Sequence, residues 1–229
     1  MKRILSITIW VVVIAGILVL LGFIEAEHKK TSCKGLEVII DYQNGDPMIT
    51  KSDIERQINT ILDTVVGKRL SDIETKTIEN KLNETALIAD ADVFTTLTGT
   101  LKVKVIQRKP ILRIVNSSNQ NFYIDETGAA MPSVNGYPSR VLVASGNILE
   151  KYSDTLTIHA NLPNSTLAKL HTISRYIYQH DFLKSQIEQI YVTQDGEFEL
   201  VPKVGRQLII FGDIEDMEKK FDKLIVFYS

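Results

Sequence analysis

Residues 4–24 read ILSITIWVVVIAGILVLLGFI, an unbroken run of 21 uncharged and mostly apolar residues directly after Lys2 and Arg3. As an α-helix with about 1.5 Å of rise per residue, this run would extend about 31 Å, which matches the hydrocarbon thickness of a bilayer. A secretory signal peptide is the alternative, but its apolar region is shorter, about 7 to 15 residues, and ends at small residues suited to cleavage. The run therefore predicts an uncleaved transmembrane helix that tethers the rest of the fold.

The charges on either side of this run predict its orientation. Lys2 and Arg3 precede it, whereas residues 25–30 mix glutamates, a histidine and lysines with little net bias. The positive-inside rule then favours a cytoplasmic N-terminus. We expect residues 1–3 to be a cytoplasmic tail, residues 25–35 a juxtamembrane linker, and the remaining chain to lie outside the cytoplasm.

The composition limits what the exported part can be. About 200 residues remain after the anchor, which is enough for two ordinary domains. The 26 basic and 28 acidic side chains give a net charge of −2, which argues against nucleic acid as a partner. The single cysteine, Cys33, has no internal partner, so stability has to come from burial rather than from a disulfide. A lipid or an intermolecular bridge on Cys33 is the alternative, but an incidental thiol is favoured.

The hydrophobic pattern of residues 36–115 predicts a compact α+β module. Alternating apolar residues indicate strands, and repeats at three and four residues indicate helices. The predicted elements are a strand at 36–42, a helix opened by a capping box at Ser52 and Glu55, a second helix from Ser71 to about Asn83, and strands at 89–95 and 101–105 around a turn at 98–100. Pro110 is expected to stop the last strand. This βααββ order allows two helices to cover one face of a small sheet.

Residues 116–229 predict a second domain, a β domain of mostly antiparallel sheet with two helices. Its predicted elements are a strand at 122–124 before the turn Asp125–Gly128, a strand at 141–143, a helix capped by Ser165, a hairpin at 187–202 around Asp195 and Gly196, a strand at 207–211 and, after Gly212, a helix with Met217, Phe221 and Leu224. The sequence then ends in apolar residues with no closing strand. An uncovered sheet edge invites pairing, so we expect that a partner covers it or that more chain follows.

The residues that could act in catalysis or bind a metal show no motif or spacing that predicts a shared site. His28, His159, His171 and His180 lack the three or four ligands that a zinc site needs, and Ser145 lacks the frame of a nucleophile elbow. Asp90 and Asp92 alternate with apolar residues, which favours the solvated face of a strand over an acid–base pair. The turn at residues 125–128 lacks the acidic repeats of a calcium loop. We therefore predict no catalytic, cofactor-binding or metal-binding residues.

The order of these parts resembles the FtsQ/DivIB family of bacterial cell-division proteins. The resemblance rests on VIQRKPI at residues 105–111, on Tyr123, Ile124, Asp125 and Gly128 at the start of the second domain, and on Phe211 and Gly212 before the last helix. The stretch YPSRVLVASG at residues 137–146 is similar to one branch of the family. The resemblance identifies residues 36–115 as a POTRA domain and residues 116–229 as the family's β domain, without its last strand.

This resemblance implies a non-catalytic scaffold at the division septum. Such a protein spans the bacterial inner membrane once, holds its domains in the periplasm and links early division proteins to septal cell-wall synthesis by binding FtsL and FtsB. The POTRA domain is implied to act in recruitment, and the β domain to offer a sheet edge to a partner strand. No cofactor, nucleic acid or small-molecule substrate is implied.

The resemblance also suggests roles for single residues. It implies partner binding at Gln107, Arg108, Pro110, Val226, Phe227 and Tyr228, and structural turns at Asp125, Gly128 and Gly212. The chain departs from the family at two of these places. Gln107 stands where the family often has a glutamate, and the family's last strand is missing or reduced to Val226, Phe227 and Tyr228.

Two alternatives remain. A POTRA-type periplasmic adaptor of an envelope assembly or export system would fit the first domain, but such proteins usually carry several POTRA repeats or a long membrane barrel. A membrane-tethered cell-wall enzyme with a pair of carboxylates is the other alternative, and the lack of a nucleophile-and-base frame disfavours it.

Overall fold

The structure is a computed structural model that describes residues 10, 13–17, 32–134 and 139–228. The chain forms two compact units. The first contains residues up to Ile40 with Thr50–Asn83 and Asp90–Val105, and the second contains Asp41–Ile49, Glu84–Ala89 and the chain from Ile106 onward. The predicted cytoplasmic tail and most of the predicted anchor and linker lie outside the described residues. Within the described part of the chain, no helix is long and apolar enough to cross a bilayer.

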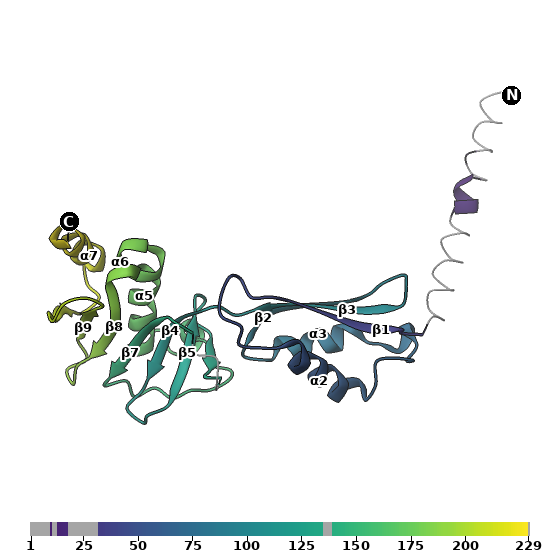
Figure 1. Cartoon of the computed structure of the whole chain (residues 1–229), viewed down its shortest axis with the longest axis horizontal. Helices are drawn as coiled ribbons and strands as arrows, with labels where there is room; N and C mark the ends of the chain where they lie inside the picture. Colours follow the sequence, from purple (N-terminus) through teal and green to yellow (C-terminus); the bar gives the residue numbers. More distant parts are fainter. Residues whose placement is uncertain (1–9, 11–12, 18–31, 135–138, 229) are drawn as a thin grey trace. The chain divides into compact units, whose positions relative to one another are not determined.

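The first unit is a three-stranded sheet with two helices against one face (Figure 1). The strand order is β1-β3-β2. The elements are β1 (Gly35–Asp41), α2 (Lys51–Leu62), the short 3₁₀ helix η1 (Leu70–Asp72), α3 (Thr75–Asn83), β2 (Ile88–Thr95) and β3 (Thr100–Gln107). The predicted strand–helix–helix–strand–strand order is confirmed. The core of this unit contains Ile54, Ile58, Ile78, Leu82, Leu101 and Val103, all fully buried.

Local details of this unit differ from the prediction. The capping box of α2 is formed by Thr50 and Asp53, so the prediction of Ser52 and Glu55 was wrong. Both pairs have the required spacing, but Thr50 lies outside the helix, where its side chain can accept the backbone N–H of Asp53. Ser71 and Asp72 lie in η1, and the second α-helix begins only at Thr75.

Three side chains of the first unit that were considered for chemistry have ordinary structural positions. Cys33 is buried, and its Sγ donates a hydrogen bond to the carbonyl oxygen of Gly35 at 3.3 Å. Asp90 and Asp92 are both exposed on β2, as predicted for its solvated face. Neither observation points to a reaction in this unit.

The second unit is a seven-stranded mixed sheet with strand order β10-β9-β8-β7-β4-β5-β6 (Figure 1). Its strands are β4 (Pro110–Val115), β5 (Asn121–Asp125), β6 (Ala130–Pro132), β7 (Leu142–Gly146), β8 (Ile187–Val192), β9 (Phe198–Pro202) and β10 (Ile209–Gly212). The central strands β4, β7 and β8 are parallel, and the outer pairings are antiparallel. Residues 110–115 were grouped with the first domain in the sequence analysis, yet they form β4 near the middle of this sheet.

The main core of the second unit lies between the sheet and α5 (Thr166–Gln179). Ser165 caps α5 by accepting the N–H of Ala168 at 3.1 Å, and the predicted apolar stripe of Leu167, Leu170, Ile173 and Ile177 is buried. Burial of each such side chain contributes about 1.5–3 kcal/mol to stability. The prediction of two helices was incomplete, because α4 (Ile158–Asn161) and α6 (Asp181–Gln186) accompany α5 and α7 (Met217–Tyr228).

The last helix runs farther than the sequence analysis expected. Val226, Phe227 and Tyr228 belong to α7, so their interpretation as the remnant of a strand was wrong. Phe221 anchors the helix, because its ring stacks on Tyr176 at 4.8 Å and packs against Phe211. The packing of Phe221 and the helix that precedes Val226 outweigh the intrinsic preference of Val226, Phe227 and Tyr228 for a strand.

Candidate functional site

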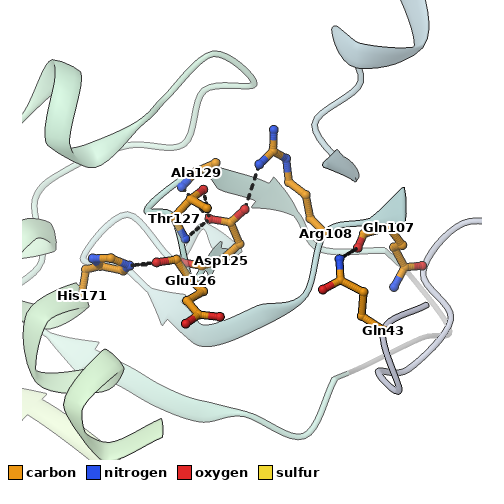
Figure 2. Close-up of polar contacts among 8 residues, drawn as sticks. All are labelled: Gln43, Gln107, Arg108, Asp125, Glu126, Thr127, Ala129 and His171. Carbon is orange, nitrogen blue, oxygen red and sulfur yellow. Dashed lines mark hydrogen bonds and ion pairs between the residues drawn. The ribbon is translucent and has the colours of Figure 1, made fainter. Parts of the chain in front are cut away.

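Gln107, at the end of β3, is a buried hydrogen-bonding centre. Its Oε1 accepts the backbone N–H groups of Met48 at 2.7 Å and Ile49 at 3.1 Å, and its Nε2 donates to the carbonyl oxygen of Asp46 at 2.9 Å. Its own carbonyl oxygen accepts Nε2 of Gln43 at 3.0 Å (Figure 2). The residue is 1 % exposed, so its polar groups form hydrogen bonds within the protein. Its role in partner binding stays a prediction.

Arg108 and Asp125 form an ion pair beside this centre. Nη1 of Arg108 lies 2.9 Å from Oδ2 of Asp125, whose side chain is only 5 % exposed. The second carboxylate oxygen accepts the N–H of Thr127 at 2.9 Å, its hydroxyl at 2.7 Å and the N–H of Ala129 at 2.8 Å (Figure 2). Both carboxylate oxygens are thus occupied, and Asp125 holds the turn that follows β5.

Gly128 and His171 complete this turn. Gly128 has φ +86°, and a Cβ at this position would lie 3.1 Å from the ring of His159, so the position favours glycine. Nε2 of His171 lies 3.1 Å from the carbonyl oxygens of both Asp125 and Glu126 (Figure 2). Burial, followed by the neighbouring His159, lowers the pKa of His171, so the neutral ring donates its N–H to these carbonyls. The sequence analysis rejected His171 as a metal ligand and did not predict this structural role.

Pro110 opens β4 at an irregular point of the sheet. It pairs with Asp125, and the register between β4 and β5 shifts between Pro110 and Leu112. A proline is tolerated at the first residue of a strand or at a bulge because it has no N–H to donate. The sequence analysis interpreted Pro110 as the end of a strand, whereas it marks the start of another.

A second candidate region, which we call the C-terminal edge, consists of exposed apolar side chains on and beside β10 and on α7. Its members are Leu208, Ile210, Val226 and Phe227, which are 51 %, 79 %, 75 % and 76 % exposed. Nε2 of Gln207 donates to Oη of Tyr228 at 3.1 Å, which ties the end of α7 to the segment before β10. Among the described residues, β10 pairs with β9 alone and forms one edge of the sheet. Gly212, with φ +75°, directs the chain from this strand toward α7.

The described residues contain no group of three or more His, Cys, Asp or Glu side chains that could hold a metal ion. The polar side chains around Asp125 are engaged with one another and with the backbone, in an arrangement that fixes turns.

The sequence matches two known families in succession. A POTRA-like domain family matches residues 31–106, and the FtsQ/DivIB, C-terminal related family matches residues 109–229. No individual curated protein matches the sequence. The α+β architecture is therefore a POTRA-like domain followed by a β-rich domain, and both families are non-catalytic in general. Since the FtsQ/DivIB match covers more than half of the 229 residues, the chain belongs to the FtsQ/DivIB family, as a division-associated protein with a POTRA-like domain.

Proposed function

We propose that this protein is a non-catalytic scaffold of the division apparatus that binds FtsL and FtsB and links early division proteins to septal cell-wall synthesis. Residues 4–24 anchor it in the inner membrane as a single pass, with residues 1–3 in the cytoplasm. The linker, the POTRA domain up to about residue 107 and the β domain from Pro110 onward lie in the periplasm at the septum. The apolar run and the flanking charges support this placement.

The observation that carries the proposal is the C-terminal edge. An edge strand presents unpaired backbone N–H and C=O groups, and an added strand from a partner satisfies them. Here the segment before the edge strand β10 is bonded to the end of α7, which carries exposed apolar side chains, so a partner would find both backbone pairing and apolar anchors. Each backbone hydrogen bond contributes about 0.5–1.5 kcal/mol, so a short added strand needs such anchors to bind stably.

Val226, Phe227 and Tyr228 are proposed to contact the partner from α7. Gln107, Arg108 and Pro110 are proposed to act on partner binding by fixing the backbone of residues 106–110, because the polar groups of the first two are bonded inside the second unit. Ile106, 36 % exposed, is the apolar side chain that this segment offers to a partner.

The experiment compares two charged substitutions at the C-terminal edge with a matched control. Ile210→Glu and Phe227→Glu should weaken co-purification of the FtsB and FtsL homologues at least tenfold, since burying an unpaired carboxylate in an interface is costly. Leu149→Glu is the control, because Leu149 is 70 % exposed on a loop after β7 and lies outside the C-terminal edge. All three variants should fold like the wild type.

In cells, a fluorescent fusion should gather at midcell, and depletion should give filaments. The two edge variants should fail to correct filamentation, whereas Leu149→Glu should correct it. Uniform envelope fluorescence in dividing cells, or full complementation by Ile210→Glu and Phe227→Glu together, would contradict the proposal.

A further inference from the structure

The second unit contains a cavity of about 700 Å³ at the end of its sheet where β4, β7 and β8 begin. Residues at the starts of these strands line it together with the last turn of α5 and the loop at residues 44–46. Leu142, Val143 and Tyr178 are half-buried and give it an apolar wall. This volume is in the range of small-ligand binding sites.

The charges around this cavity are strongly biased. Five cationic side chains line it, namely Lys109, Arg113, Arg140, Lys184 and Lys203. Only two carboxylates, Asp46 and Glu188, accompany them. The resulting excess of three positive charges stands in a chain whose net charge is −2, so the fold concentrates cations at this place.

The pairing of these five cations differs from that of other cations in the chain. Among the described residues, none of them forms an ion pair, whereas Lys102, Arg108 and Lys220 each pair with an acidic residue at 3.0, 2.9 and 2.8 Å. Exposed lysines and arginines are often unpaired, but five around one cavity repel one another. An anion in the cavity would remove that repulsion.

Several of the cations are held in place. The Nζ atoms of Lys109 and Lys184 lie 5.6 and 4.5 Å from the ring centre of Tyr178, which partly offsets their like charge. Nζ of Lys203 donates to the carbonyl oxygen of Lys184 at 2.9 Å. Nε of Arg113 donates to Oδ1 of Asn121 at 2.9 Å, which leaves the outer guanidinium N–H groups available for a ligand.

We propose that this cavity, which we call the cationic pocket, binds an acidic peptide segment of a partner protein. The carboxylates of the segment would meet the lysine and arginine side chains, and an aliphatic or aromatic side chain would lie on the wall formed by Leu142, Val143 and Tyr178. Asp46 and Glu188 favour a peptide over a dense phosphate group, because they repel multivalent phosphate but can accept peptide N–H groups. The cationic pocket is independent of the proposed strand pairing at the C-terminal edge.

The test measures fluorescence anisotropy of a labelled ten-residue peptide that carries four acidic residues around a phenylalanine and a leucine. The full chain is used in a neutral detergent. A second peptide, with the acids replaced by their amides, reports binding that needs no charge. Unlabelled acidic peptide and inorganic tripolyphosphate serve as competitors, because they distinguish carboxylate from phosphate recognition.

The decisive variant is Arg140→Gln with Lys184→Gln, since both side chains are exposed and their loss leaves the core intact. It should weaken binding of the acidic peptide about tenfold, which corresponds to about 1.4 kcal/mol. The control Lys151→Gln with Lys169→Gln removes the same charge from exposed positions outside the pocket and should change binding less than about twofold. Arg140→Lys with Lys184→Arg keeps the charge and should bind nearly as the wild type does.

Three results would overturn the proposal. Equal binding of the acidic and amide peptides would exclude recognition of carboxylates. An unchanged affinity in the Arg140→Gln, Lys184→Gln variant, with Lys203→Gln as a second check, would place binding elsewhere. Displacement by tripolyphosphate at lower concentration than by unlabelled peptide would assign the pocket to phosphate. Loss of partner binding in the edge variants with acidic-peptide binding intact would leave this inference standing.

Discussion

Replacing Gln107 with alanine should destabilise the second unit more than its single amide group suggests. The substitution removes one acceptor that serves two backbone N–H groups, of Met48 and Ile49, and one donor to the carbonyl oxygen of Asp46. Because Gln107, Met48 and Ile49 are all buried, the N–H groups of Met48 and Ile49 would lose their partner where water has poor access. The effect should therefore come mainly from unsatisfied groups and less from lost contact area.

The magnitude follows from the two buried N–H groups. An unsatisfied buried donor or acceptor costs about 1–3 kcal/mol, and some water can enter the space left by the shortened side chain. We expect a loss of about 2–5 kcal/mol. That is a large part of the stability of an ordinary domain, which is about 5–15 kcal/mol.

Native-state hydrogen exchange on the full-length chain measures this loss of stability at the affected backbone amides. Peptides covering residues 44–50 should exchange at least about thirtyfold faster in Gln107→Ala, since about 2 kcal/mol corresponds to that factor. Gln43→Ala is the matched control, because it removes one bond from an exposed amide to the carbonyl oxygen of Gln107 and should cost under about 1 kcal/mol. Equal exchange rates at Met48 and Ile49 in the two variants would refute the reasoning.

Two further predictions concern the turn after β5. Asp125→Ala should cost about 3–5 kcal/mol, because it leaves the Arg108 charge and the N–H groups of Thr127 and Ala129 without partners. Asp125→Asn keeps an acceptor for those N–H groups and should cost less, so equal urea midpoints for the two variants would contradict this account. Because burial lowers the pKa of His171 below its ordinary value of 6.5, the unfolded chain binds that proton more readily. Stability should therefore fall as the pH drops from about 7 to about 5, and His171→Gln should flatten the slope of melting temperature against pH, whereas an unchanged slope would exclude His171 as its source.

The elements that the sequence predicted well are those with local signals. The stripe on α5 repeats at three and four residues, and Asp195 and Gly196 mark the turn between β8 and β9. The strand β4 escaped prediction because Pro110 signals a break and because most of its residues are buried, which hides any alternation. Its parallel pairing with β7 is also non-local, and no short-range pattern specifies it.

The candidate sites were harder to predict because their contacts, too, join residues that are far apart in the sequence. The side chain of Gln107 bonds to residues 58 to 61 positions earlier in the chain, so its spacing carries no signal. The cations of the cationic pocket come from separate strands and helices between Lys109 and Lys203, and no basic stripe exists in the sequence. Charge can thus be concentrated by the fold in a chain whose overall composition is slightly acidic.

Where partners bind can be argued from which polar and apolar groups the fold leaves unsatisfied. Gln107, Asp125 and His171 already bond to partners inside the second unit, so a ligand could engage them only by breaking those bonds. The edge of β10 and the cationic pocket differ, because the first presents backbone groups beside exposed apolar side chains and the second holds five cations against two carboxylates. Only groups that the fold leaves unsatisfied contribute favourably to the free energy of binding when a partner binds. Substitutions around Asp125 should therefore change stability first and partner affinity only as a consequence, whereas substitutions at the C-terminal edge or in the cationic pocket should change affinity in a protein that still folds.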